Sequence, residues 1–254
     1  MNHSDIKIIE DLSLNAWPSH QMQLYDGWIL RFSHFYTHRT NSVEQIGASQ
    51  ISTEEKIAYC EEIYRRWESP CIFKITPLVD KSFDRLLEEK GYEIQHATTV
   101  MRMDIADAHF QDKALPRGFT IEVKKRIPDE WIDALFTIKE DCTVIHMKIV
   151  PSMYAAIPKD VLCVSVRDGK RIVATGLGIL DRDYIGIYAI NVDKKYRRQG
   201  IARKVCEMLL RQGSAAGATK AYLQVVTGND KAVALYTSLG FVPEYEYWFR
   251  VKEV

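Results

Sequence analysis

The stretch from Asn191 to Val205 contains the residue types best suited to chemistry in this chain. Six basic side chains fall within it, against Asp193 as its only acid: Lys194, Lys195, Arg197, Arg198, Arg203 and Lys204. A helix is expected to begin at Ile201, after an apolar strand over 184–192. Helix starts expose unpartnered N–H groups and a partial positive charge, and glycine lets a ligand approach the backbone.

The pattern Arg197-x-x-Gly200-x-Ala202 therefore predicts a binding site for a di-anion such as a pyrophosphate. The competing interpretation is a solvated basic loop in front of an amphipathic helix, because one glycine pattern alone is weak evidence.

Composition narrows the class of protein. The 254 residues are 46% hydrophobic, enough for one large domain or two small ones. Lys plus Arg equals Asp plus Glu at 34 each, which argues against a dedicated nucleic-acid binder. No apolar run has membrane-spanning length, and the N-terminus lacks the pattern of a signal peptide. Five scattered cysteines, without metal-ligand spacing, predict reduced thiols in a cytoplasmic protein.

The C-terminal half, 119–254, alternates strands and helices. Apolar periodicity and turn residues predict strands over 119–125, 161–166, 172–180, 184–192, 221–226 and 245–251. Helices are predicted over 128–138, 201–211 and 230–239, the last ended by Gly240. Residues 167–170 form a predicted hairpin turn between two of these strands.

The N-terminal half, 1–105, shows a less complete version of the same order, and 106–118 is a polar segment typical of a linker. Strands are predicted over 27–33, 41–46, 71–75 and 100–105. Helices are predicted over 53–67, with Thr53 as N-cap, and 81–89, ended by Gly91.

Segments 81–92 and 231–241 resemble each other, since each is a helix followed by glycine, an aromatic residue and a strand. This similarity predicts a degenerate tandem duplication, although the same order can also arise by chance in α/β proteins.

Three motifs in order give the C-terminal half a family resemblance. They are Arg197-Arg-Gln-Gly-Ile-Ala202, Thr227-Gly-Asn229-Asp-Lys-Ala232 and Tyr236-x-x-x-Gly240-Phe241. Together they resemble the GNAT-type N-acetyltransferase superfamily. Asp26-Gly-Trp-Ile-Leu-Arg31 followed by Arg39-Thr-Asn-Ser-Val43 resembles the first lobe of two-lobed members. The implied fold is α/β (α+β), with tandem lobes that each hold a mixed, mostly antiparallel twisted sheet flanked by helices.

The resemblance implies an N-acyltransferase that moves an acetyl group from acetyl-CoA directly to an amine. Most of the implied cofactor residues lie on the strand before the helix start or at the helix start itself: Ile190, Val192, Arg197, Arg198, Gln199, Gly200, Ile201 and Ala202. Two more, Asn229 and Ala232, lie at the start of the next helix. Asn229 is equally well explained as a helix N-cap. The N-terminal lobe has no Arg-x-x-Gly-x-Ala counterpart and is expected not to bind CoA.

Tyr236 is the candidate catalytic acid, because a phenol with an unperturbed pKa of about 10 stays protonated and can donate to a departing thiolate. The alternative is a buried helix aromatic. No base is assigned: Asp181, Asp183 and Glu122 are better explained as surface or turn residues, and a water is an equally good candidate. His34, His38 and His146 are read as surface or core histidines, and no metal site is predicted.

The expected partner is a small-molecule or peptide amine, with neither nucleic acid nor membrane involved, and the protein is expected to be a monomer or homodimer. The alternative from another class is a non-catalytic acyl-CoA sensor, which would need the 197–202 loop but not Tyr236. A nucleotide-binding protein is disfavoured because the Gly-x-x-x-x-Gly-Lys and Gly-x-Gly-x-x-Gly patterns are missing.

Overall fold

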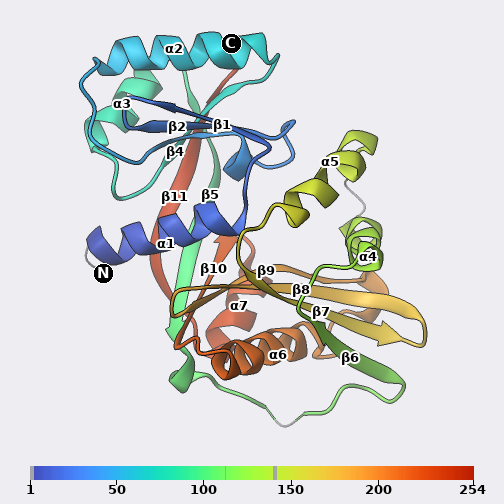
Figure 1. Cartoon of the computed structure of the whole chain (residues 1–254). Coiled ribbons are helices and arrows are strands. Elements are labelled where there is room, and N and C mark those ends of the chain that lie inside the picture. Colours follow the sequence, from blue (N-terminus) through green and yellow to red (C-terminus); the bar gives the residue numbers. More distant parts are fainter. Residues whose placement is uncertain (1–2, 112, 140–141) are drawn as a thin grey trace.

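The computed structural model describes residues 3–111, 113–139 and 142–254. Residues 1 and 2, which belong to the predicted N-terminal half, and residue 112 of the predicted linker lie outside the described residues. The strands form one eleven-stranded sheet in the order β1-β2-β3-β4-β11-β5-β10-β9-β8-β7-β6 (Figure 1). Their bounds are β1 Gln21–Tyr25, β2 Trp28–Phe32, β3 Val43–Gln45, β4 Cys71–Ile75, β5 Glu93–Asp104, β6 Phe119–Lys124, β7 Asp160–Asp168, β8 Arg171–Asp181, β9 Tyr184–Val192, β10 Lys220–Val226 and β11 Val242–Lys252.

Helices lie on both faces of this sheet. They are α1 His3–Ala16, α2 Thr53–Arg66, α3 Lys81–Glu89, α4 Asp129–Lys139, α5 Val144–Ala155, α6 Ile201–Ala215 and α7 Asp230–Leu239. In Figure 1, α2 and α3 belong to the upper, N-terminal lobe, α4, α6 and α7 belong to the lower, C-terminal lobe, and α1 lies between the lobes.

The two lobes share one core order of strands and helices, to which the C-terminal lobe adds β6 and a second helix. In the N-terminal lobe β1, β2 and β3 are antiparallel, and β3 pairs parallel with β4 through the crossover helix α2. In the C-terminal lobe β7, β8 and β9 are antiparallel, and β9 pairs parallel with β10 through α6. The fold is therefore a tandem pair of GNAT-like lobes, and the shared order agrees with the predicted duplication.

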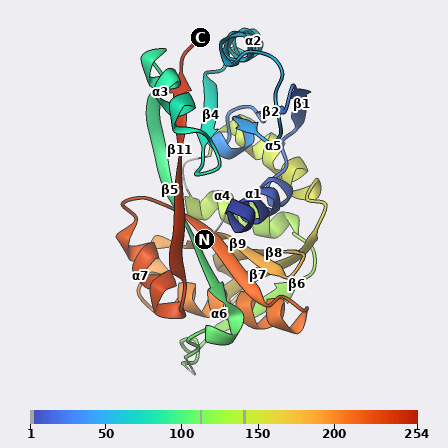
Figure 2. The ribbon, with the colours of Figure 1, turned by 90° about the vertical axis from the view of Figure 1, so that its left-hand side faces the viewer.

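The last strand of each lobe lies in the other lobe's sheet. β5, which follows α3, pairs antiparallel with β10, and β11, which follows α7, pairs antiparallel with β4. β5 and β11 also pair with each other, and Figure 2 shows both running the height of the molecule. The lobes are thus joined by backbone hydrogen bonds as well as by side-chain packing.

A buried group of charges fastens α1 to the sheet. The carboxylate of Glu10 on α1 accepts hydrogen bonds from the Lys74 ammonium and, at 2.6 Å, from the Tyr245 hydroxyl. Glu44 lies 3.6 Å from both Lys74 and Arg31. Burial opposes the positive charge of Lys74, but Glu10 and Glu44 outweigh it and raise the pKa of the ammonium. Buried charges need such pairing, so removing one partner would leave the remaining charges buried and unpaired, which is destabilising.

Most of the sequence-predicted elements are present, with three kinds of correction. Ser52, not Thr53, is the N-cap of α2, because its hydroxyl accepts from the Glu55 N–H at 3.3 Å. The strand predicted from Val100 begins at Glu93, in a polar stretch that the sheet pairs with β11. The sequence patterns do not predict α1, β1 or α5.

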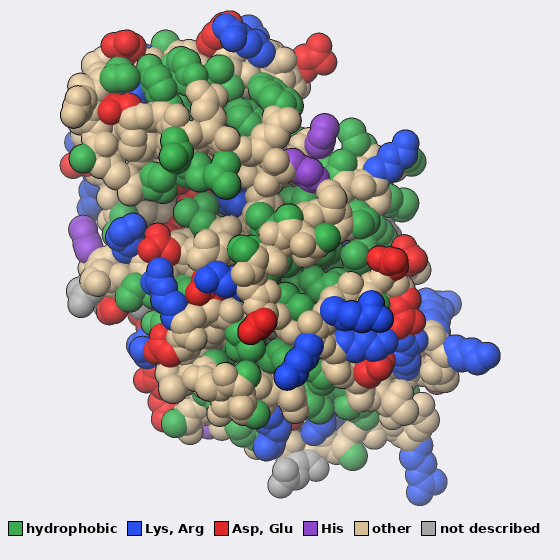
Figure 3. All heavy atoms as spheres, in the orientation of Figure 1, with side chains coloured by type: hydrophobic (Ala, Val, Ile, Leu, Met, Phe, Trp, Pro, Cys, Tyr) green, Lys and Arg blue, Asp and Glu red, His purple; other side chains and the backbone are tan. Residues whose placement is uncertain are grey.

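Acidic side chains lie among the Lys and Arg side chains where these gather on the surface. In the view of Figure 3 they cluster on the C-terminal lobe, with acidic side chains beside them. On β6, β7 and α4, for example, Glu130 lies 3.1 Å from Lys124 and 2.7 Å from Arg167. Exposed pairs of this kind contribute little to stability but leave no large field of one sign on this face.

Candidate functional site

The start of α6 is an uncapped helix N-terminus open to solvent. Asp193 follows the last residue of β9, and its carboxylate accepts from the Lys195 N–H at 3.0 Å. Arg198 and Gly200 adopt positive φ angles of 61° and 80°, and Gly200 is the N-cap, with no side chain that could accept from the first turn. A Cβ at Gly200 would meet no atom within 4 Å, so the space directly beside this residue is open. This geometry fits an anionic ligand held by backbone N–H groups.

The basic side chains around this helix start divide into two groups. Arg197, Arg198 and Gln199 are exposed in the loop, beside Gly200. Arg203 instead points into the protein, where it donates to the His109 carbonyl at 3.0 Å and to the Ser238 hydroxyl at 2.7 Å. Only part of the positive cluster is therefore directed at solvent, while Arg203 ties the helix to α7 and to the segment after β5.

Ile201 and Ala202 begin the helix itself. Ile201 is a buried anchor in the core of the C-terminal lobe, and Ala202 is half-buried. A cavity of about 240 Å³ lies beside Gly200, between Leu115 of the predicted linker, Arg203 and Leu235 of α7. The linker thus forms part of the surroundings of the helix start.

Strands β9 and β10 separate beside this helix. Their parallel pairing extends from Tyr184 opposite Lys220 to Ile187 opposite Leu223 and then ends. A bulge follows in β9, where Ala189 has a φ of 50° and the register with β8 shifts. The main chain of Ile190 and Asn191 is consequently free of pairing with β10, as the family resemblance implies for the strand that faces the pantetheine arm.

The main chain of Val192, which is predicted to contact the cofactor, already makes a hydrogen bond within the protein. Its carbonyl accepts from Arg197 Nε at 3.0 Å, so this oxygen is engaged within the protein. The side chain of Ile190 faces the core, where its Cδ1 is among the atoms closest to Gly176. Ile190 also lines the cavity between the lobes.

Asn229 caps α7. Its Oδ1 accepts from the Ala232 N–H at 3.2 Å, which confirms the capping role considered from the sequence and places Ala232 as its partner. Both residues lie at the exposed end of the helix, close in sequence to the end of β10. Their contact with a cofactor stays a prediction.

Tyr236 lies on α7 and lines a cavity between the lobes that also involves β9. Its ring packs edge-on against Phe241 at 6.1 Å, and its hydroxyl makes no hydrogen bond to any described residue. Burial, with a smaller contribution from Cys206, raises the pKa of the phenol well above its usual value. The group therefore stays protonated at neutral pH and has a proton to donate.

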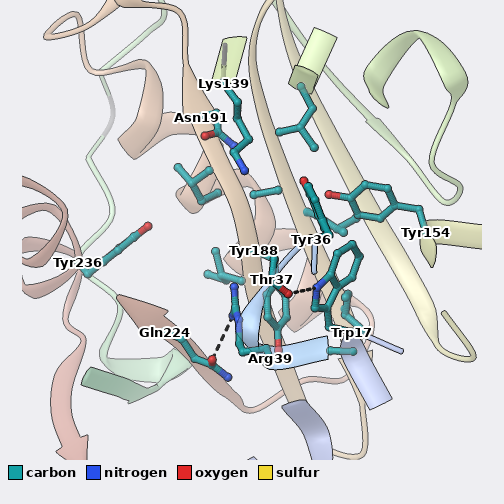
Figure 4. Close-up of a pocket in the computed structure, with 17 residues that line it drawn as sticks. Trp17, Tyr36, Thr37, Arg39, Lys139, Tyr154, Tyr188, Asn191, Gln224 and Tyr236 are labelled. Atoms are coloured by element: carbon teal, nitrogen blue, oxygen red, sulfur yellow. Dashed lines mark hydrogen bonds between the residues drawn. The ribbon is translucent and has the colours of Figure 1, made fainter. Parts of the chain in front are cut away.

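A cavity of about 280 Å³ lies between the lobes, with Tyr236 on one side (Figure 4). The C-terminal lobe contributes Tyr154, Tyr188 and Asn191, and the N-terminal half contributes Trp17 and Arg39. Adjacent residues of α7 face the two cavities: Leu235 lines the one beside Gly200, and Tyr236 lines this one. The two cavities therefore lie on either side of α7 residues that are adjacent in sequence.

The cavity lining is cationic and aromatic. Arg39 and Lys139 carry positive charge, and no described lining residue is a carboxylate. The acids considered from the sequence lie elsewhere: Asp181 accepts from Asn15 at 2.8 Å and Lys159 at 2.9 Å, and Asp183 lies 2.8 Å from Lys220. Glu122 lies 3.3 Å from Lys124. Within the described chain, no three His, Cys, Asp or Glu side chains group as a metal site would require.

Sequence reasoning missed most of this cavity. Arg39 belongs to the Arg39-Thr-Asn-Ser-Val43 motif, whose residue types and spacing predict no role for it. Trp17, Lys139 and Gln224 come from elements far apart in sequence, and only their packing brings them together. His38, the neighbour of Arg39, is half-buried, with its Nε2 3.2 Å from Gln95 Oε1.

Other sequence-based expectations concern the thiols and the membrane. All five cysteines are free, and four are buried, while Cys142 is half-buried. Over the residues that the structure describes, none of the helices combines the length and apolarity that a membrane span needs.

Comparison with known proteins identifies the family. Residues 3–249 match the family model described as "Probable histone acetyltransferase Rv0428c C-terminal", and the chain belongs to this family within the GNAT N-acetyltransferases. The chain is 26% identical over 258 residues to a Bacillus subtilis (strain 168) protein named "Uncharacterized N-acetyltransferase YobR", covering 98% of this chain and 99% of that one.

Solved structures share the two-lobed fold. A GCN5-related N-acetyltransferase from Kribbella flavida superposes with a TM-score of 0.71 at 17% identity, covering 99% of this chain and 95% of that one. A tandem GNAT protein from the clavulanic acid biosynthesis pathway superposes with a TM-score of 0.65 at 14% identity, covering 84% of this chain and 75% of that one. At these identities the likeness concerns the fold alone.

Proposed function

We propose that this protein is an acyl-CoA-dependent N-acyltransferase that moves an acetyl group from acetyl-CoA to a small-molecule or peptide amine. One observation carries the proposal: the uncapped start of α6 follows β9 in the chain, and the end of β9 that is unpaired with β10 lines the inter-lobe cavity together with Tyr236. We also propose a cytoplasmic location, on the basis of the free cysteines.

Acetyl-CoA would supply the activated acyl group. The N–H groups from Gly200 to Ala202, with Arg197 and Arg198, would hold its pyrophosphate, since they combine an open helix start with exposed positive charge. Unpaired backbone groups at Ile190 would orient the arm along β9. Gln199 and Asn229 would be further contacts of the cofactor.

The amine would attack from the inter-lobe cavity, forming the C–N bond as the C–S bond breaks. Tyr236 would give its proton to the departing sulfur, and a free hydroxyl with a raised pKa suits that role. Because no described lining residue is a carboxylate, the amine would enter neutral or lose its proton to water.

The alternative is a non-catalytic acyl-CoA sensor of the same fold. A sensor needs the α6 start but neither a tyrosine with a free hydroxyl nor a cavity beside it. Both are present, which favours the enzyme.

The test is an acceptor screen with acetyl-CoA that follows thiol release, together with melting curves. An N-acyltransferase should release thiol with at least one amine, and acetyl-CoA should raise the melting temperature because it binds the folded state. A raised melting temperature without turnover across the screen would support the sensor instead. No effect of acetyl-CoA in either assay would contradict both.

A further inference from the structure

The inter-lobe cavity contains a positive charge from the N-terminal lobe that the proposed acyl transfer does not use. Resting on the proposed function, we propose that the acceptor is a small amine that also carries a carboxylate, and that Arg39 binds this carboxylate. The lobe without a cofactor site would then determine acceptor specificity.

The Arg39 guanidinium is oriented but not neutralised. Its Nη1 donates to Gln224 Oε1 at 3.1 Å, and Gln224 is itself fixed by the Tyr247 hydroxyl and by Ser13 Oγ, each at 2.7 Å. Within the described residues Arg39 has no carboxylate within ion-pair distance. A guanidinium has five N–H donors, so this arrangement leaves several for a ligand in the cavity that Arg39 lines (Figure 4).

The backbone that carries Arg39 is held by buried groups. Arg31, inside the charge cluster, donates to the Arg39 carbonyl at 2.7 Å and also to the Trp17 carbonyl, so one side chain fixes two walls of the cavity. Asn41 holds the same loop, accepting from the Ser33 N–H and donating to the Thr37 carbonyl, each at 2.7 Å. A site held this rigidly loses little entropy when a ligand binds.

Charge in the cavity favours an anion. Lys139 is a second cation in the lining, with its ammonium 5.5 Å from the centre of the Tyr36 ring. Since no described lining residue is acidic, a polycationic acceptor would meet repulsion without compensation. A guanidinium pairs with a carboxylate through parallel hydrogen bonds, which a neutral amide cannot match.

Size and lining restrict the acceptor further. The volume of about 280 Å³ suits a small molecule rather than a folded peptide segment. Trp17 packs 5.0 Å from Tyr154 and 6.1 Å from Tyr36, measured between ring centres, so the body of the acceptor would lie against aromatic rings. An amine with an apolar or aromatic body and a carboxylate at one end satisfies both the charge and the walls.

The experiment compares matched pairs of amines that differ only in the acid. The pairs are 4-(aminomethyl)benzoate with 4-(aminomethyl)benzamide, L-phenylalanine with L-phenylalaninamide, and β-alanine with β-alaninamide. Thiol release gives kcat/KM for each. We expect an acid to exceed its amide by roughly tenfold to a hundredfold in at least one pair, the range of a lost hydrogen bond to a charged group.

Arg39→Met should remove that preference, because it keeps an unbranched apolar stem and removes the charge, whereas Arg39→Lys should keep part of it. Arg65→Met, an exposed arginine on α2, should leave the preference unchanged. The thermal shift with acetyl-CoA reports whether each variant is folded. If Arg39→Met does not fold, the acid-to-amide ratio of the parent and of Arg39→Lys decides.

The proposal is overturned if the parent uses amides, or amines without any acid, as well as or better than the acids, or if folded Arg39→Met keeps the preference. Either result leaves the proposed function standing. Absence of turnover with every amine and absence of an acetyl-CoA shift would overturn the proposed function and this inference together.

Discussion

The helix starts of α2 and α6 occupy the same place in the two lobes but have opposite chemistry. Each helix crosses over between two parallel strands. At α2 the Ser52 hydroxyl fills the cap, and Glu54 and Glu55 bring negative charge to the first turn. At α6 Gly200 leaves the cap empty, and the first turn has no acid. Only α6 presents N–H groups and positive charge to an anionic ligand.

The next helices differ in the same way. Tyr236 on α7 precedes Gly240 by four residues, and the same position before Gly91 on α3 is Leu87, which is fully buried. Gly240 is required there, since its φ is 110° and a Cβ would lie 2.8 Å from the Asp107 carbonyl oxygen. The helix–glycine–aromatic framework is common to both lobes, whereas the hydroxyl that could act on a substrate belongs to one.

A third difference is a feature that the N-terminal lobe has and the C-terminal lobe lacks, namely a long loop. The loop between β2 and β3 spans residues 33–42 and reaches the inter-lobe cavity, while Arg182 and Asp183 alone connect β8 to β9. Core packing thus preserves the repeated fold, while a few surface residues differ between the lobes and give each lobe a different candidate role. The C-terminal lobe has the candidate cofactor site, and the N-terminal lobe supplies part of the acceptor wall.

The largest expected effect comes from giving the α6 start the negative charge that α2 carries. Gly200→Glu should abolish stabilisation by acetyl-CoA, because it places bulk and charge where the pyrophosphate would lie. The parent should gain about 2.7 kcal/mol at a ligand concentration of a hundred times Kd. Melting curves with and without acetyl-CoA measure the effect.

Gly217→Glu is the matched control, because Gly217 lies just beyond the other end of α6, has a φ of 100° and also has open space around it. It should keep the full ligand response despite similar backbone strain. A folded Gly200→Glu variant stabilised as much as the parent would show that the site is misplaced.

Removing the hydroxyl that distinguishes α7 from α3 should have the next largest effect. Tyr236→Phe keeps the ring against Phe241 and should lower kcat by about a hundredfold, the low end for general acid catalysis because a thiolate is a fair leaving group. Affinity for acetyl-CoA should change little. Steady-state kinetics at saturating acetyl-CoA measure this, with Tyr59→Phe in the N-terminal lobe as the control. A kcat within twofold of the parent would argue for a packing role.

The cap of α2 should matter for stability alone. Ser52→Ala removes the acceptor for the Glu55 N–H and should lower the free energy of unfolding by about 1 kcal/mol. Urea titration checks this, and Ser214→Ala on the exposed end of α6 should change little. An altered acetyl-CoA response in Ser52→Ala would mean that the two helix starts are coupled, contrary to the comparison.

The smallest effect concerns pH and the β2–β3 loop, whose counterpart between β8 and β9 is only two residues long. Burial and the nearby His96 lower the pKa of His38, although Gln95 partly opposes them. The folded protein then binds this proton more weakly than the unfolded chain, so stability is full above about pH 6.5, the unfolded pKa, and falls below it.

His38→Asn should therefore lose less stability than the parent between pH 7.5 and 5.5. Urea titrations at both pH values and constant ionic strength give the difference between the two proteins. Equal losses would assign the pH dependence to other groups.

Much of the fold followed from local pattern. Segments 71–75, 81–89, 184–192 and 230–239 were predicted with the bounds that the structure has, because their apolar periodicity and end residues agree. Elements α5 and β1 were not predicted, for local reasons. Pro151 lies inside α5, where a helix normally avoids proline, and β1 is an edge strand that exposes Met22 and Leu24.

Local sequence alone accounts for the open start of α6, the glycine that permits it and the tyrosine near the end of α7. These depend on residues a few positions apart, whose backbone geometry and charge act locally. Only the tertiary structure decided the exchange of β5 and β11, the burial of Glu10 with Lys74, and the cavity that joins Arg39 to Tyr236. Those features depend on strand pairing and burial between segments that are distant in sequence. Which charged side chains are buried and desolvated is decided by the fold and is not visible in the local sequence.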